Sequence, residues 1–250
     1  MFFGTYVTDP GNKFAVEVLI NGSPAELFRR SGDGKVFVAG QPGQHYTLRV
    51  HNMTLGRLEI VCAVDQRSTT IDGPATLDNR GMIVDPGDSG EFKGWRLNSG
   101  SVGEFVFADL GSDVSTQATG GAGGAGIIGF AAFTELASVP QSLPYMPDPA
   151  SGPFARRSEG YGSRFGGGEE LLRMPVESYG PSVGTGIGPT IPDPVRVVRF
   201  QRAGGAPSVL AIGYHTPDML AAMGVLRREP LPFPEQRPFG TGYDAYRRVR

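Results

Sequence analysis

Short apolar alternations with a period of two, separated by turn-forming residues, dominate the first half of the sequence. In the stretch KFAVEVLI (13–20) every second residue from Phe14 is apolar, while Glu17 falls on the opposite face. This period is that of a half-buried β-strand and differs from the 3.6-residue period of a helix. Asn21-Gly22 follows, and this pair favours a hairpin turn because both residues tolerate a positive φ.

Short strand-like stretches recur about every ten residues as far as Leu136, and the last of them, 126–136, is apolar on nearly all sides and is expected to be a fully buried strand. Further strands are expected at 25–30, 35–40, 45–50, 57–65, 81–85, 92–97, 103–110 and 126–136. Turn sequences rich in Gly, Pro and Asp separate them, and such spacing is typical of β-sandwiches and barrels. We therefore predict an all-β protein in which residues 1–136 form an antiparallel, jelly-roll-like β-sandwich.

The second half has a different composition. Many of the 38 glycines and 21 prolines of the chain crowd residues 137–193, which we interpret as a Gly/Pro-rich arm or linker. Residues 194–226 are predicted to form a β-hairpin and a short helix, with Thr216 as N-cap and Pro217 at the first helical position. Residues 227–250 form a basic aromatic tail that cannot fold alone.

Charge and cysteine content exclude several classes of protein. A formal net charge of −2 argues against general nucleic-acid binding. The single cysteine, Cys62, excludes an internal disulfide and a cysteine-cluster metal site, and its apolar neighbours predict a buried side chain. We expect no secretory signal, because the amino terminus lacks a basic region and a long apolar run. No membrane span is expected either, since no apolar run approaches about 18 residues.

Two motifs resemble catalytic or cofactor-binding sequences. The run Gly121–Gly126 fits the dinucleotide-binding pattern G-x-G-x-x-G, but no strand directly precedes it and no acidic strand end follows, so we interpret it as a loop. Gly87-Asp88-Ser89-Gly90 resembles the nucleophile motif of chymotrypsin-like proteases. Neither His45 nor His51 lies in the sequence setting of the catalytic base, so a turn is expected here.

The remaining polar candidates do not form a metal or cofactor site by spacing. His45 and His51 would lie about 20 Å apart on one extended strand, and His215 is distant in sequence. Four aspartates lie near strand ends and are interpreted as turn residues rather than calcium ligands: Asp65, Asp72, Asp85 and Asp88. Trp95 is expected to anchor the core, with sugar stacking as the alternative. We therefore predict no catalytic, metal or cofactor-binding residue.

The carboxy-terminal tail combines arginines with aromatic side chains, the residue types enriched in binding hot spots. A segment of this kind can order on binding a neighbouring subunit. Contact with nucleic acid phosphates is the less favoured interpretation. The predicted partner-interface residues are Phe233, Arg237, Phe239, Tyr243, Tyr246, Arg247, Arg248 and Arg250.

The order of strands and turns, including VEVLINGSPAELF (16–28), GKVFVAGQPGQHYTLRVHN (34–52), FKGWRL (92–97) and GIIGFAAF (126–133), resembles an uncharacterised family of β-rich proteins found in bacterial, prophage and virus genomes. The resemblance covers about residues 14–136 and part of the 194–215 unit. It implies a viral structural setting. It supplies no enzymatic activity and no catalytic residue.

From these features we expect a non-enzymatic virion structural protein of a bacterial virus, such as a minor capsid, vertex (penton) or decoration protein. It would be made in the host cytoplasm, lie in the virion, and contact other capsid or virion proteins as a homo-oligomer in a symmetric assembly. The alternative is a carbohydrate- or surface-binding sandwich that uses Trp95 and the Asp-rich turns. A hydrolase built around Ser89 is a third hypothesis.

Overall fold

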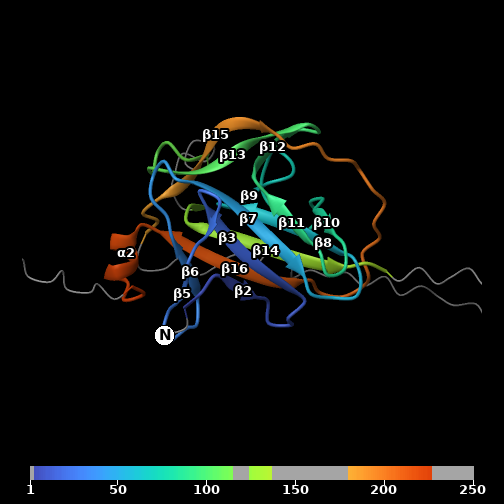
Figure 1. Ribbon diagram of the computed structural model, residues 1–250, viewed down its shortest axis with the longest axis horizontal. Helices are drawn as coiled ribbons and strands as arrows, with labels where there is room; N and C mark the ends of the chain where they lie inside the picture. Colours follow the sequence, from blue (N-terminus) through green and yellow to red (C-terminus); the bar gives the residue numbers. More distant parts are fainter. Residues whose placement is uncertain (1–2, 115–123, 137–179, 227–250) are drawn as a thin grey trace, which may run out of the picture.

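The alternating strands pair into two sheets that face each other (Figure 1). The computed structural model describes residues 3–114, 124–136 and 180–226. Sheet A contains, in order, β1 (Phe3–Gly4), β5 (Leu27–Arg29), β6 (Val36–Ala39), β16 (Ser208–His215), β14 (Ile127–Thr134), β8 (Leu58–Val64) and β10 (Met82–Val84), with β9 (Arg67–Ser68) beside β8. Sheet B contains β12 (Gly94–Asn98), β13 (Ser101–Ala108), β7 (His45–Asn52), β3 (Phe14–Ile20) and β2 (Tyr6–Thr8), with β11 (Ser89–Phe92) beside β7, β15 (Gly184–Pro192) beside β13 and β4 (Ser23–Pro24) beside β3.

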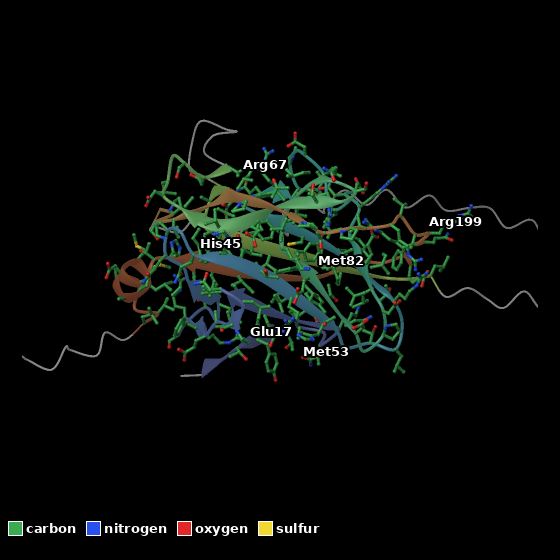
Figure 2. All side chains as sticks on the ribbon, turned by 45° about the horizontal axis from the view of Figure 1, so that its top comes forward. Glu17, His45, Met53, Arg67, Met82 and Arg199 are labelled. Carbon is green, nitrogen blue, oxygen red and sulfur yellow. The ribbon has the colours of Figure 1, made fainter. Side chains whose placement is uncertain are left out.

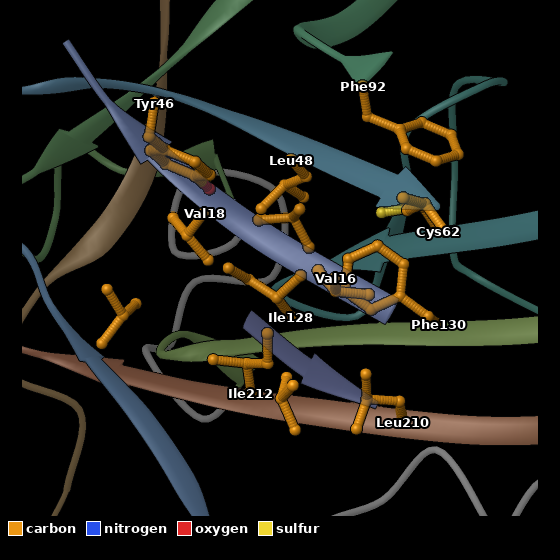
Figure 3. Packing of buried hydrophobic residues seen from close by; sticks show 14 of the residues in the cluster. Val16, Val18, Tyr46, Leu48, Cys62, Phe92, Ile128, Phe130, Leu210 and Ile212 are labelled. Carbon is orange, nitrogen blue, oxygen red and sulfur yellow. The ribbon is translucent and has the colours of Figure 1, made fainter. Parts of the chain in front are cut away.

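The core lies between the two sheets and is filled by every second residue of their strands. In β7 the buried side chains of Tyr46, Leu48 and Val50 alternate with partly exposed neighbours. Figure 3 shows Leu48 of sheet B and Ile128 of sheet A in the same cluster. Burial of such side chains is the main favourable term in folding. The predicted all-β antiparallel sandwich is therefore confirmed, with one parallel pairing between β6 and β16.

The turn predicted at Asn21-Gly22 and the helix start predicted at Thr216-Pro217 are both present in the structure. Asn21 and Gly22 have φ values of 50° and 82° and join β3 to β4. The helix α2 (Pro217–Ala222) begins after Thr216, whose hydroxyl accepts a hydrogen bond from the amide of Met219. In both places the residue type alone favours the observed backbone.

The structure differs from the sequence prediction between residues 180 and 215. Within the predicted arm, Gly184–Pro192 form the strand β15, which pairs with β13 along most of its length. Its prolines are tolerated because β15 lies at a sheet edge. The expected hairpin is replaced by a long-range arrangement: β16 pairs with β14 and β6, because this position buries Leu210, Ile212 and Tyr214 in the core.

The glycine run leads into a strand. Gly126 has a φ of +90°, and β14 begins at the next residue, whereas a dinucleotide-binding loop opens a helix. Gly121 and Gly123 lie outside the described residues, as do most of the 137–193 segment and all of the 227–250 tail. Among the described residues, no helix has both the length and the apolar character that spanning a membrane requires.

The close approach of β12 and β13 depends on Gly94. A Cβ at this position would lie 1.9 Å from the carbonyl oxygen of Gly103. We expect Gly94→Ala to lower the free energy of unfolding by about 3 kcal/mol, because backbone must move to admit the methyl group. Gly56→Ala is the matched control, since a Cβ there meets no atom within 4 Å, and it should change the value by less than about 0.5 kcal/mol. Urea unfolding measures both, and equal stabilities would contradict the prediction.

Candidate functional site

A chain of buried hydroxyl groups crosses the core from sheet B to sheet A and ends on a carboxylate. The Tyr46 hydroxyl lies 2.7 Å from Thr185 Oγ1, which lies 2.7 Å from the Tyr214 hydroxyl. Tyr214 donates to both oxygens of Asp65, at 2.7 and 2.6 Å. Asp65 is 1% exposed and follows β8 in a turn where its φ is +49°.

Backbone amides complete the surroundings of the Asp65 carboxylate. Oδ1 accepts from the amides of Gly126 and Ile127, and Oδ2 accepts from the amide of Thr185 at 3.0 Å. With Asp65 ionised, every hydroxyl is satisfied when Tyr46 donates to Thr185, and Thr185 to Tyr214. Burial nevertheless raises the pKa of Asp65 to about 7, while the hydrogen bonds from Tyr214 and the amides oppose this rise. The network is enclosed, and its geometry fixes the beginning of β15.

Ion pairs fix the other end of β15. The guanidinium of Arg96 donates to the carbonyl oxygen of Asp193 at 2.5 Å and also pairs with its carboxylate. The amides of Asp193 and Val195 donate to the carbonyl oxygens of Gly100 and Ser99. The chain therefore leaves β15 from a defined position.

We call the Arg96–Asp193 contact the first clamp. A second clamp, formed by Arg202, holds the chain again shortly before β16. Its guanidinium donates to Glu59 Oε2 at 2.6 Å and to the carbonyl oxygens of Leu77 and Asn79. The same group lies over the ring of Phe133, 3.7 Å from its centroid. Hydrogen bonds to charged groups in such a fork are among the stronger ones in proteins.

Between the two clamps runs an extended segment, Pro194–Phe200, which we call the valine–arginine segment. It follows β15 as the orange loop at the right of Figure 1. Val195, Val197 and Val198 are 53%, 86% and 40% exposed. No backbone–backbone hydrogen bond between described residues involves 196–200. Unpaired backbone beside exposed β-branched side chains resembles the free edge of a sheet.

One end of the sandwich carries this segment. Figure 2 shows Arg199 far from His45, which lies toward the other end of the molecule. Arg57 holds this segment against the sandwich. Its guanidinium pairs with Glu135, donates to the carbonyl oxygen of Arg199 and lies over the ring of Phe200. The hydrogen bond from Arg57 lowers the pKa of Glu135. The segment is thus supported from below, while its valines face outward.

Ser89 and Gly90, which the sequence predicts in a turn, begin the strand β11 instead, because they pair with β7. Ser89 is the cross-strand partner of His51, and His51 Nε2 lies 3.0 Å from Glu17 Oε2 on the outer face of sheet B. Arg49 pairs with both Glu17 and Glu91 on the same face. Among the described residues the Ser89 hydroxyl makes no hydrogen bond to His51, whose Nε2 is engaged by Glu17. These residues form a ladder of paired charges across three strands.

The other histidines are not brought together. His45 Nδ1 lies 3.2 Å from Glu104 Oε2 but makes no hydrogen bond to it, and His215 Nδ1 lies 3.2 Å from the Ser182 hydroxyl. Within the described ranges, no three His, Cys, Asp or Glu side chains gather closely enough to hold a metal ion.

Trp95 and Cys62 are core residues. Trp95 is 6% exposed, packs edge-on against Phe105 and donates to the carbonyl oxygen of Gly186. Cys62 is buried, and burial raises the pKa of its thiol. Trp95 therefore presents no face on which a sugar ring could stack.

The acidic turn residues have separate roles. Asp72 is exposed and pairs with Arg67, and Asp88 accepts a hydrogen bond from the amide of Ser89. Asp65 alone of the aspartates singled out in the sequence is buried. The predicted partner residues from Phe233 to Arg250 lie outside the described residues.

The sequence prediction missed the exposure of the valine–arginine segment, although its pattern contains a signal. In an extended chain Arg196 and Arg199 fall on opposite faces, so neither face is apolar throughout. A strand with an arginine on each face does not fit between two covering layers.

Comparison of the chain with protein-family models, with curated proteins and with solved structures gave no match. The candidate site therefore rests on the geometry described above. Its central feature is a clamped, outward-facing strand-like segment.

The Asp65 network predicts a pH-dependent stability. Between pH 4 and pH 7 the folded protein retains a proton on Asp65 that the unfolded chain has released, because the pKa rises from 3.8 to about 7 on folding. The free energy of unfolding should therefore fall as pH rises through this range, by up to about 4 kcal/mol from this group. Asp65→Asn, which cannot ionise, should lose this slope, as urea unfolding at each pH would show.

Asp72→Asn provides the matched control for this measurement. The Asp72 side chain is 96% exposed, so its removal should leave the slope of the wild-type protein unchanged. Identical slopes for wild type and Asp65→Asn would show that Asp65 does not retain its proton in the folded state.

Proposed function

We propose that this protein is a structural subunit of a larger protein assembly and that the valine–arginine segment joins it to a neighbouring subunit. The observation that carries this proposal is the exposure of Val195 and Val197 on an extended backbone that is clamped at both ends. Exposed apolar side chains beside unpaired backbone groups are the features by which strands add to one another.

The clamps matter because they reduce the entropy cost of association. A segment that is already extended loses less conformational freedom on binding than a free tail. The Arg96–Asp193 and Arg202–Glu59 contacts maintain this conformation in the single chain. A neighbouring strand can then gain backbone hydrogen bonds and cover the valines at a small ordering cost.

Charge indicates which surface the neighbouring subunit presents. Arg196 and Arg199 are exposed, and neither makes an ion pair among the described contacts. Acidic side chains on the neighbouring strand would complement them and steer the encounter. The contact is thus expected between a basic, valine-rich edge and an acidic one.

The finer proposal is a virion of a bacterial virus, with the chain as a minor capsid, vertex or decoration protein made in the host cytoplasm. Its support is the resemblance of the strand pattern to β-rich proteins of prophage and virus genomes, together with the clamped segment. Symmetric assemblies supply many copies of one edge to one partner surface. The basic aromatic tail would add a second contact to the same assembly.

The alternative of a carbohydrate-binding module depended on an exposed Trp95, and this side chain is buried. Trp95 lies in the core with its indole N–H bonded to the backbone. An aromatic side chain that binds sugar must expose one face of its ring to the solvent. The assembly proposal is therefore the one that the described surface favours.

The proposal is tested by comparing the mass of the particle formed by the wild-type protein with that formed by the variant Val197→Glu. We expect wild-type protein from its natural source, or at high concentration, to sediment as a species larger than one chain. Val197→Glu should shift it toward the monomer, because a buried unpaired carboxylate opposes the contact. Analytical ultracentrifugation measures both species.

Leu55→Glu is the control, since Leu55 is fully exposed on the β7–β8 loop and lies outside the valine–arginine segment. It should sediment as the wild-type protein does. The proposal is overturned when the wild-type chain is monomeric in every preparation, or when both variants dissociate equally.

A further inference from the structure

A groove of about 480 Å³ lies outside the valine–arginine segment. It is lined by residues of β2 and the turn that follows it, of the β5–β6 hairpin, and of the first half of β16. Its apolar lining comes from Val7, Val36 and Leu210, which are themselves nearly buried. In Figure 1 these elements lie in the lower part of the view, near the N-terminus.

Two unpaired strand edges border this groove. The parallel pairing of β16 with β6 begins only at Ile212, so Ser208–Ala211 have no strand on that side among the described residues. The chain of the β5–β6 hairpin turns away at Lys35, just where a longer β6 would continue. Across the groove, β2 pairs with β3 on one side and is the last strand of sheet B. Both edges therefore offer backbone donors and acceptors.

The charged lining of the groove is basic. Arg29 donates from Nη1 to the carbonyl oxygen of Gly34 at 2.7 Å, which holds its guanidinium at the rim and leaves Nε and Nη2 for another acceptor. Lys35 lies beside it, 3.7 Å from Asp33. The carboxylate of Asp9 also lines the groove, but it is buried against the amides of Gly11, Lys13 and Phe14.

The unpaired strand edges and the basic rim of the groove favour an extended, acidic peptide as its ligand. An extended peptide uses the free edges, and its alternate side chains reach the apolar lining, as in strand addition. The unpaired edge of Ser208–Ala211 matches about four residues, or about 13 Å of extended chain. A carboxylate on that peptide complements Arg29, whose fork geometry suits bidentate recognition. The valine–arginine segment of another copy is disfavoured, because it carries Arg196 and Arg199.

We propose that this basic groove binds an extended segment of a different polypeptide, rich in β-branched residues and carrying an acidic side chain, by adding it as a strand between β2 and β16. The proposal is independent of the assembly contact at residues 194–200, because it uses other strands and other residues.

The experiment uses random decapeptides displayed on phage and selected on the immobilised full chain. We expect enrichment of alternating Val, Ile or Thr with at least one Asp or Glu. A synthetic peptide of the selected sequence should bind at least tenfold more weakly to Arg29→Glu than to wild type. Arg196→Glu, the same charge reversal on the valine–arginine segment, should bind as wild type does.

Two further measurements separate strand addition from other binding. N-methylation of alternate peptide amides should abolish binding, and NMR should show shifts of the amides of Thr8 and Val209–Ala211. The side chain of Arg29 is exposed, so Arg29→Gln, which removes the charge without reversing it, should fold normally and confirm the loss of affinity.

The proposal is overturned when no sequence class is enriched, when the selected peptide binds Arg29→Glu as tightly as wild type, or when the N-methylated peptide binds equally well. Displacement of the peptide by laurate without the amide shifts would assign the groove to an anionic amphiphile. Failure of the assembly test at Val197 leaves these readouts unaffected, so the two proposals can fail separately.

Discussion

The buried carboxylate of Asp65 is the constraint on which the arrangement of the two sheets depends. It cannot remain in the core without donors, and burying an unsatisfied carboxylate would cost several kcal/mol. The donors come from four places: the loop before β14, the beginning of β15, Tyr214 of β16 and, through Thr185, Tyr46 of β7. Segments distant in sequence must therefore meet at one point, and both sheets contribute.

This requirement explains why β15 is part of the sandwich. Its proline and glycine content gives it a weak intrinsic preference for a strand. Thr185 nevertheless contributes its amide to Asp65 and its hydroxyl to both tyrosines, and the aromatic rings of Phe107 and Tyr214 pack around these groups. Once Thr185 is fixed, the following residues pair with β13 as far as Pro192. The hydrogen bonds of Thr185 thus place β15 in the sheet, although the apolar pattern of its sequence does not predict a strand there.

The sequence predicts the part of the fold that depends on local patterns. Period-two alternation identifies strands such as β3 and β7, the apolar run of 126–136 identifies β14, Asn21-Gly22 identifies a turn, and Thr216-Pro217 identifies the helix start. It does not predict that Asp65 is buried, because the partner Thr185 is 120 residues away and an aspartate after a strand has the same local sequence as a solvated turn. Likewise, the VRVVRF pattern predicts a strand but not the loss of its hairpin partner, since β16 pairs with the distant strand β14 instead.

The candidate sites follow from the same competition between local and long-range pairing. When β16 joins β14, the residues before it are left as a loop of strand-like sequence, in which residues 196–200 make no backbone–backbone hydrogen bond to another described residue. Because β6 begins only at Val36, the first half of β16 has one edge that pairs with no strand in the described part of the chain. Native proteins usually cover, shorten or charge such edges to prevent unwanted pairing. At both candidate sites arginines lie beside the unpaired edge, and their charge disfavours pairing of that edge with an equally basic strand. The same arginines leave both edges open to an acidic strand, so one device provides protection against the wrong partner and selection of the right one.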